Sequence, residues 1–108
     1  MKFDYETSPA AIYERSFGIV EAEAKAGLDR LPLDARAVAV RMIHACGVPG
    51  IVDDLVITPG FVTAARAALR AERPVYMDAE MVRMGLVSAL IPPRIPLSCI
   101  AHGHRAAA

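Results

Sequence analysis

The chain has 108 residues, which limits it to one domain or part of one. Twelve basic and twelve acidic side chains cancel, so the charge balance gives no indication of binding to nucleic acid or to an anionic membrane. The hydrophobic fraction of 55% is high for a chain this short. We therefore expect that a partner covers some apolar surface, or that the chain lacks the part of its domain that would cover it.

The sequence contains no run of about 18 uncharged apolar residues, which argues against a transmembrane helix. Acidic side chains occur near the start, where a signal peptide would have its apolar core. We therefore expect a cytoplasmic protein. Cys46 and Cys99 each lie in an apolar run, so we interpret them as small buried side chains that form no disulfide.

A first helix is predicted to begin at Ser8 and Pro9, because serine is a favoured N-cap and proline a favoured first helical residue. It is expected to run to about Ala26 and to stop at Gly27. Its apolar face consists of Ile12, Tyr13, Phe17, Ile19, Val20 and Ala24.

Two polar side chains, Ser16 and Glu23, interrupt this face, where a helix packed on a core should be apolar. A residue that breaks a local rule without visible compensation often marks a functional site. For Ser16 the structural alternative is a hydrogen bond back to the carbonyl of Ile12. For Glu23 the alternative is a buried or interfacial ion pair.

The next helix is almost wholly apolar from Val38 to Cys46, and it is predicted to end at Gly47, which easily takes the left-handed conformation. At 100° per residue, one broad apolar face is formed by Ala35, Val38, Ala39, Met42, Ile43, Ala45 and Cys46.

His44 is predicted on the opposite side of this helix, where its neighbours are Ala37, Val40 and Arg41. An imidazole among small apolar neighbours is a candidate proton donor. The structural alternative is a histidine whose ring nitrogens are both satisfied by the fold. Cys46 lies about 200° further around the helix, so we do not expect the two to share a metal or to act as base and nucleophile.

The rest of the chain alternates strand and helix signals. Apolar runs predict strands at residues 55–57, 74–77 and 95–100. One helix is predicted to start at Thr58-Pro59, which repeats the cap-plus-proline signal of Ser8-Pro9, and another at Ala79 with Asp78 as N-cap. Ser88 is expected to cap one further turn. With two N-terminal helices before it, this order predicts an α/β fold with a parallel sheet of about three strands and βαβαβ crossovers.

The predicted sheet is incomplete by itself, because a parallel sheet needs cover on both faces and usually has more than three strands. No helix signal follows the third strand, and residues 101–108 show no apolar period. We therefore expect a single partial α/β domain over residues 1–108. Cys99, His102 and His104 form only a weak metal-like cluster without a fourth ligand of known spacing, so no metal site is predicted.

Three separated motifs stand out along the chain: residues 12–17 (IYERSF), 40–47 (VRMIHACG) and 78–82 (DAEMV). Together they resemble the N-terminal half of the precorrin-8X methylmutase family, also called cobalt-precorrin-8 methylmutase. Residues 55–69 and 74–77 are similar to the same half in order and spacing. The resemblance covers residues 5–91, and residues 94–108 diverge from it.

The resemblance implies an α/β homodimer and an isomerase of cobalamin biosynthesis that needs no cofactor. The implied reaction moves a methyl group from C11 to C12 of the tetrapyrrole precorrin-8X, which gives hydrogenobyrinate. The resemblance also makes His44 the catalytic residue, which protonates or hydrogen-bonds the ring during the migration. The substrate-binding residues that it implies are Arg15, Ser16, Asp78, Met81 and Ser88.

This chemistry suits the residue types. A rearrangement within one molecule needs a held geometry and a group that steadies charge on the ring, and it needs no nucleophile or metal. The substrate carries many carboxylates, so we expect arginines such as Arg15 to anchor it. The structural alternative for Arg15 is a solvated charge at the rim of its helix.

Members of the family are longer than this chain, and their second half completes the sheet and part of the pocket. By the resemblance the chain is a truncated member, for which we expect weak or no activity alone. The alternative function is a non-catalytic module that binds a tetrapyrrole or a partner chain through its uncovered sheet. We expect neither nucleic acid nor membrane as a partner.

Overall fold

The structure is a computed structural model that describes residues 5–86 and 90–100. The chain divides into two units, Met1–Val62 and Thr63–Ala108, and each is described by itself. The elements in chain order are α1 Pro9–Glu23, α2 Lys25–Leu28, the 3₁₀ helix η1 Leu33–Ala35, α3 Arg36–Cys46, the 3₁₀ helix η2 Pro49–Asp54, α4 Phe61–Arg70, β1 Val75–Met77, α5 Glu80–Met84 and β2 Leu97–Cys99.

The predicted start of α1 is confirmed. The side chain of Ser8 accepts a hydrogen bond from the backbone N–H of Ala11 at 3.4 Å, and proline occupies the first turn. The predicted end at Gly27 is wrong, because α1 ends at Glu23 and Gly27 lies inside α2. Gly27 is buried there, and a Cβ atom at this position would collide with the side chain of Val52. The glycine therefore serves close packing and not helix termination.

The predicted end of α3 is confirmed, because Gly47 takes the left-handed conformation with φ 70° and its N–H donates to the Ile43 carbonyl at 2.7 Å. The predicted apolar face is only partly buried. Ala39 and Ile43 are buried as expected, but Val40 is also buried while Met42 and Cys46 are exposed. The prediction of a buried Cys46 is therefore wrong. The buried face of α3 is turned toward Val40 because the helix packs against α1 as well as η2.

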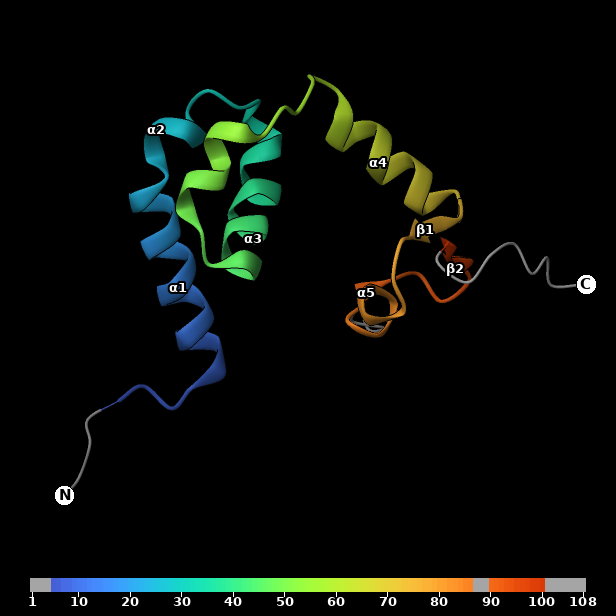
Figure 1. Ribbon diagram of the computed structural model, residues 1–108, viewed down its shortest axis with the longest axis horizontal. Coiled ribbons are helices and arrows are strands. Elements are labelled where there is room, and N and C mark those ends of the chain that lie inside the picture. Colours follow the sequence, from blue (N-terminus) through green and yellow to red (C-terminus); the bar gives the residue numbers. More distant parts are fainter. Residues whose placement is uncertain (1–4, 87–89, 101–108) are drawn as a thin grey trace, which may run out of the picture. The chain divides into compact units, whose positions relative to one another are not determined.

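The core of the first unit lies between α1, α2, α3 and η2. Its buried members are Val20, Ala24, Leu28, Ala39, Val40, Ile43 and Val52. Helices α1 and α3 lie side by side and run in opposite directions (Figure 1). This packing decides which side chains of the two helices meet at its edge.

The predicted strand at residues 55–57 is wrong. In its place, η2 is followed by a connection that pairs with no strand among the described residues, and Val56 in this connection is 91% exposed. The apolar character of the run is used in another way, since Leu55 packs against the core of the first unit. An apolar run of this length can anchor a connection as well as form a strand.

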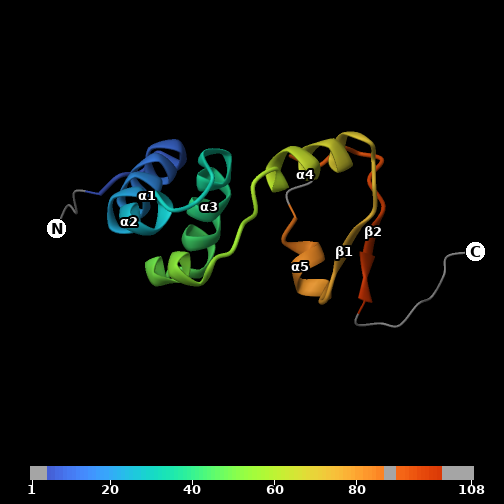
Figure 2. The same ribbon diagram turned by 90° about the horizontal axis from the view of Figure 1, so that it is seen from above.

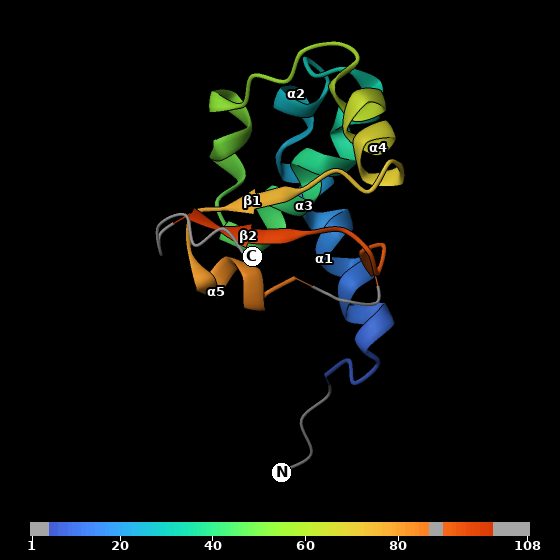
Figure 3. The ribbon, with the colours of Figure 1, turned by 90° about the vertical axis from the view of Figure 1, so that its right-hand side faces the viewer.

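The second unit contains a small parallel sheet with α5 against both strands (Figures 2 and 3). β1 pairs with β2 in the register Val75↔Leu97, Tyr76↔Ser98 and Met77↔Cys99. The broad α/β class is confirmed, but within residues 5–86 and 90–100 the sheet has two strands, not three, and one β–α–β connection.

Two predicted helix starts in the second half differ from the structure. The chain turns at Pro59 and Gly60, where Gly60 has φ 86°, so α4 begins at Phe61. The N-cap of α5 is Ala79, which makes no side-chain capping bond, so the prediction of Asp78 as the N-cap is wrong. Ser88 lies outside the described residues.

None of the helices found in residues 5–86 and 90–100 is long and apolar enough to span a bilayer. A single partial domain over residues 1–108 stays a prediction.

Candidate active site

The contact between α1 and α3 brings two predicted site residues together. The Oγ atom of Ser16 and the Nδ1 atom of His44 are 2.9 Å apart and form a hydrogen bond. Ser16 is half-buried, whereas His44 is exposed in the last turn of α3. Within the described residues the Ser16 side chain bonds to His44 and not to the Ile12 carbonyl, so the structural alternative for Ser16 is wrong.

Two aromatic rings of α1 complete the surroundings of the imidazole. The ring of Tyr13 lies 5.5 Å from the His44 ring, centroid to centroid, and the ring of Phe17 lies 5.0 Å away in an edge-on arrangement. Residues 13, 16 and 17 share one face of a helix because they are three and four positions apart. A single face of α1 therefore holds the His44 ring by one hydrogen bond and two ring contacts.

The other ring nitrogen of His44, Nε2, makes no hydrogen bond within the described part of the chain. The condition for a purely structural histidine, with both nitrogens bonded, is not met there. A hydroxyl both donates and accepts, so the bond to Ser16 fits either neutral tautomer. Nε2 is accordingly able to present either a donor or an acceptor to a bound molecule.

The positively charged side chain of Arg41 lies close to His44 and its aromatic neighbours. The guanidinium carbon of Arg41 lies 5.3 Å from the centroid of the Phe17 ring, in the range of a cation–π interaction. Arg41 precedes His44 by three positions on α3, so both side chains project from one side of the helix.

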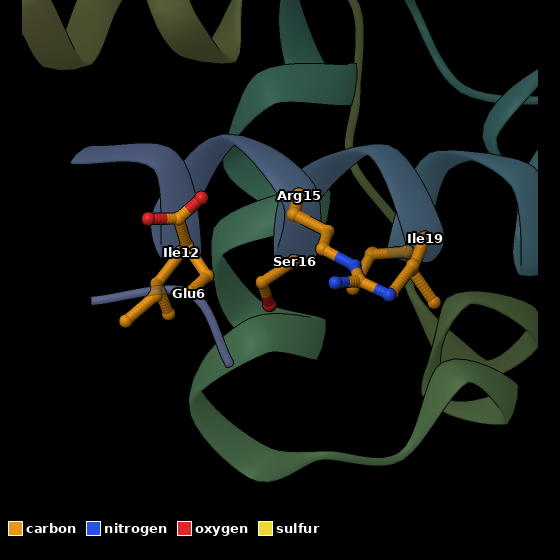
Figure 4. Close-up of a pocket in the computed structure, with 6 residues that line it drawn as sticks. Glu6, Ile12, Arg15, Ser16 and Ile19 are labelled. Carbon is orange, nitrogen blue, oxygen red and sulfur yellow. The ribbon is translucent and has the colours of Figure 1, made fainter. Parts of the chain in front are cut away.

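A groove of about 340 Å³ runs along α1 next to the Ser16–His44 bond. It is lined by Glu6, Ile12, Arg15, Ser16, Ile19 and Val20. The guanidinium of Arg15 reaches toward Ile19 at one end, and Glu6 lies beside Ile12 at the other (Figure 4). Ser16 therefore faces the groove and bonds to His44 at the same time. This volume is within the usual range for small-molecule sites.

A family model described as precorrin-8X methylmutase (CbiC) matches residues 11–108. The chain belongs to this family. The family membership expected from the three motifs is thereby confirmed, and the match runs past residue 91 to residue 108.

Two precorrin-8X methylmutases are similar to this chain. The protein from a Sinorhizobium species is 44% identical over 98 residues, which are 91% of this chain and 46% of the relative. The protein from Pseudomonas aeruginosa is 42% identical over 96 residues, which are 89% of this chain and 45% of the relative. The chain thus spans about half the length of the curated relatives that it matches.

The resemblance to the precorrin-8X methylmutases also suggested three substrate-binding residues that are not part of the first unit. Asp78 and Met81 belong to the second unit, where both are exposed, Met81 to 83%. Ser88 lies outside the described residues. Their part in a site stays a prediction.

The contacts of Tyr13 and Phe17 with His44 were not predicted, because the sequence pattern places both side chains on the apolar face of the first helix. The available signal was their spacing around Ser16, because residues at i, i+3 and i+4 meet the same neighbour. Glu23, the other polar interruption, is exposed.

The described residues contain no group of three or more His, Cys, Asp or Glu side chains placed to hold a metal ion. Of the weak metal-like cluster, His102 and His104 lie outside those residues.

Proposed function

We propose that the first unit carries the catalytic histidine of a methyl-shift isomerase that acts on precorrin-8X, with the methyl group moving from C11 to C12. The observation that supports this most directly is the geometry of His44. Its Nδ1 is bonded to Ser16, its ring is held by Tyr13 and Phe17, and its Nε2 has no hydrogen-bond partner among residues 5–86 and 90–100. Family membership supplies the reaction class.

The proposed reaction is an isomerisation, so the protein needs to supply only a fixed geometry and a proton or hydrogen-bond donor. One carbon–carbon bond breaks at C11 and one forms at C12, so substrate and product are isomers and no electrons are gained or lost. Nε2 donates a hydrogen bond or a proton to the conjugated ring while charge develops there, and the proton returns to His44 afterwards. No redox cofactor enters this balance.

In this proposal the groove along α1 receives the edge of the substrate. Arg15 binds a carboxylate of the tetrapyrrole, and Ser16 contacts the substrate while it holds His44. Asp78, Met81 and Ser88 are proposed as further substrate contacts from the second half of the chain, by resemblance alone.

The proposal is tested by assaying the purified chain at high concentration with precorrin-8X, because only weak activity is expected of this chain alone, and by following the absorbance of the ring as hydrogenobyrinate forms. We expect His44→Gln to lower the rate by about 100-fold, because one well-placed acid contributes on the order of 10²- to 10⁴-fold. The control is Arg66→Gln in α4, an exposed position outside the first unit, which should keep the wild-type rate. Equal rates for His44→Gln and the wild type would contradict the assignment.

A second candidate is a non-catalytic module that binds a partner through the sheet, and the side chains of β1 and β2 favour it. Tyr76 is 64% exposed and Leu97 is also exposed. In this case the wild type would show no turnover and His44→Gln would leave partner binding unchanged, whereas Leu97→Glu would abolish association of the chain on a sizing column.

A further inference from the structure

Among the described residues, the lysine and arginine side chains of the first unit fall into two groups. Lys25 and Arg36 pair with Asp29 at 2.6 Å and 3.2 Å, and Arg30 pairs with Asp53. Arg15 and Arg41, by contrast, have no carboxylate partner within the part of the chain that the structure describes.

Both unpaired guanidinium groups belong to the surroundings of the Ser16–His44 pair. Arg15 is adjacent to Ser16 in α1 and lines the same groove. Arg41 lies over the Phe17 ring, and that ring also contacts His44 edge-on. The cations without partners thus lie where an anionic molecule bound at His44 would meet them.

The position of Arg41 also leaves its hydrogen-bonding groups available. Within the described residues the Arg41 guanidinium makes no hydrogen bond and no ion pair, and the contact with the Phe17 ring does not use its N–H donors. These donors match the two oxygens of a carboxylate. Because Phe17 already restricts the Arg41 side chain, less conformational freedom is lost when a carboxylate binds.

We propose that Arg41 is a substrate-binding residue that takes a carboxylate at the edge of the tetrapyrrole, in addition to the carboxylate bound by Arg15. This inference rests on the proposed function and deepens it. Two anchored carboxylates and the contact with His44 Nε2 are three points of attachment, and three points fix the rotation of a flat ring in its own plane. Arg41 therefore helps to determine which ring carbon faces the imidazole.

The test is a titration of the full chain with hydrogenobyrinate, the polycarboxylate product, followed by the change in ligand absorbance. We expect Arg41→Gln to raise Kd about fivefold, since an exposed ion pair contributes up to about 1 kcal/mol. Arg41→Lys keeps the charge but loses the fork geometry, so its Kd should fall between the two. The matched control, Arg66→Gln, should bind like the wild type.

Two further measurements separate direct binding from an indirect effect of the substitution. The fully esterified methyl ester of hydrogenobyrinate has no carboxylates and should bind equally to the wild type and Arg41→Gln. The Kd for the free acid should rise less steeply with added salt in Arg41→Gln than in the wild type. An unchanged Kd for the free acid, or an equal loss for the ester, would overturn the role of Arg41.

The outcomes distinguish this inference from the proposed function. If Arg41→Gln binds like the wild type while His44→Gln still loses turnover, only the role of Arg41 is overturned. If Arg41→Gln loses affinity while His44→Gln keeps full turnover, Arg41 remains an anchor and the catalytic role of His44 is overturned. Failure of the wild type to bind hydrogenobyrinate overturns both.

Discussion

The hydroxyl of Ser16 stands where the inner face of α1 would otherwise carry an apolar side chain, and it is the hydrogen-bond partner of His44 within the described residues. A half-buried hydroxyl without a partner would destabilise the fold. The bond to Nδ1 removes this cost and fixes the orientation of the imidazole. One side chain thus serves both packing and the site.

Ser16→Ala is expected to lower kcat about tenfold, because losing a hydrogen bond of roughly 1.4 kcal/mol in the reacting state changes a rate by that factor. Steady-state kinetics with precorrin-8X provide the measurement. Ser16→Thr keeps the hydroxyl and should recover most of the rate. If Ser16→Ala and Ser16→Thr have the same kcat, the hydroxyl does not act through His44.

The ion pairs of Asp29 change the titration of its carboxyl group. The hydrogen bond from Lys25, with added attraction from Lys25 and Arg36, holds the pKa of the Asp29 carboxyl below its ordinary value. A lowered pKa in the folded state means that this carboxylate stabilises the fold above its unfolded pKa and loses that contribution as the pH falls.

We therefore expect Asp29→Asn to be less stable than the wild type at pH 7, with a gap that narrows as the pH falls below about 4. Urea unfolding at pH 7 and pH 3 measures both gaps. Asp34→Asn, at an exposed carboxylate of the same unit, serves as the control. A gap that stays constant between the two pH values would contradict the ion-pair account.

The helices show which local signals can be trusted in this chain. Ser8 with Pro9 and Gly47 mark the ends of α1 and α3 correctly, because capping depends only on residues next to one another. Gly27 was misread as a helix end because a glycine needed for close packing and a glycine needed for a left-handed turn are the same letter. Only the position of Val52, far along the chain, distinguishes them.

Two glycines of the first unit offer a matched pair of substitutions. Gly27→Ala should destabilise the protein by about 1–3 kcal/mol, because the added methyl group meets Val52 in a filled core. Gly18→Ala should stabilise it by up to about 1 kcal/mol, since the site lies in α1 with open space around it. Chemical denaturation measures both. Equal effects would show that helix propensity alone governs the two positions.

The residues of the candidate site, like the helix ends, could be predicted from the sequence only in part. His44 and Ser16 could be identified because each is polar within an apolar pattern. Tyr13, Phe17 and Arg41 could not, since an aromatic side chain on an apolar helix face looks like core, and an exposed arginine looks like a solvated charge. Their roles depend on how α1 packs on α3, which no local pattern specifies.

For the chain as a whole, the described residues form cores that belong to separate units. The first has Val20, Ile43 and their neighbours, and the second buries Met77 and Ile95. The catalytic role proposed for His44 and the inference about Arg41 are both argued from side chains of the first unit. Stability of that unit is therefore the condition on which both depend.

Ile43→Ala is expected to cost about 2–5 kcal/mol, because Ile43 is only 1% exposed and its truncation leaves a cavity. Hydrogen exchange of the full chain should show faster exchange in α1 and α3 and a smaller change in β1 and β2. Met77→Ala is the reciprocal variant, with the larger change expected in the strands. Uniform acceleration by both variants would mean that the units unfold together.

The bond between Ser16 and His44 exists only when α1 and α3 are aligned correctly along their axes, so the site depends on that alignment. One helical turn is about 5.4 Å long, so a slip of α1 along α3 by a fraction of a turn would part these atoms while both helices stayed intact. The apolar contacts behind them therefore act as a spacer that sets the working distance. On gentle heating, the methylmutase activity should therefore be lost at a lower temperature than the helical circular dichroism signal.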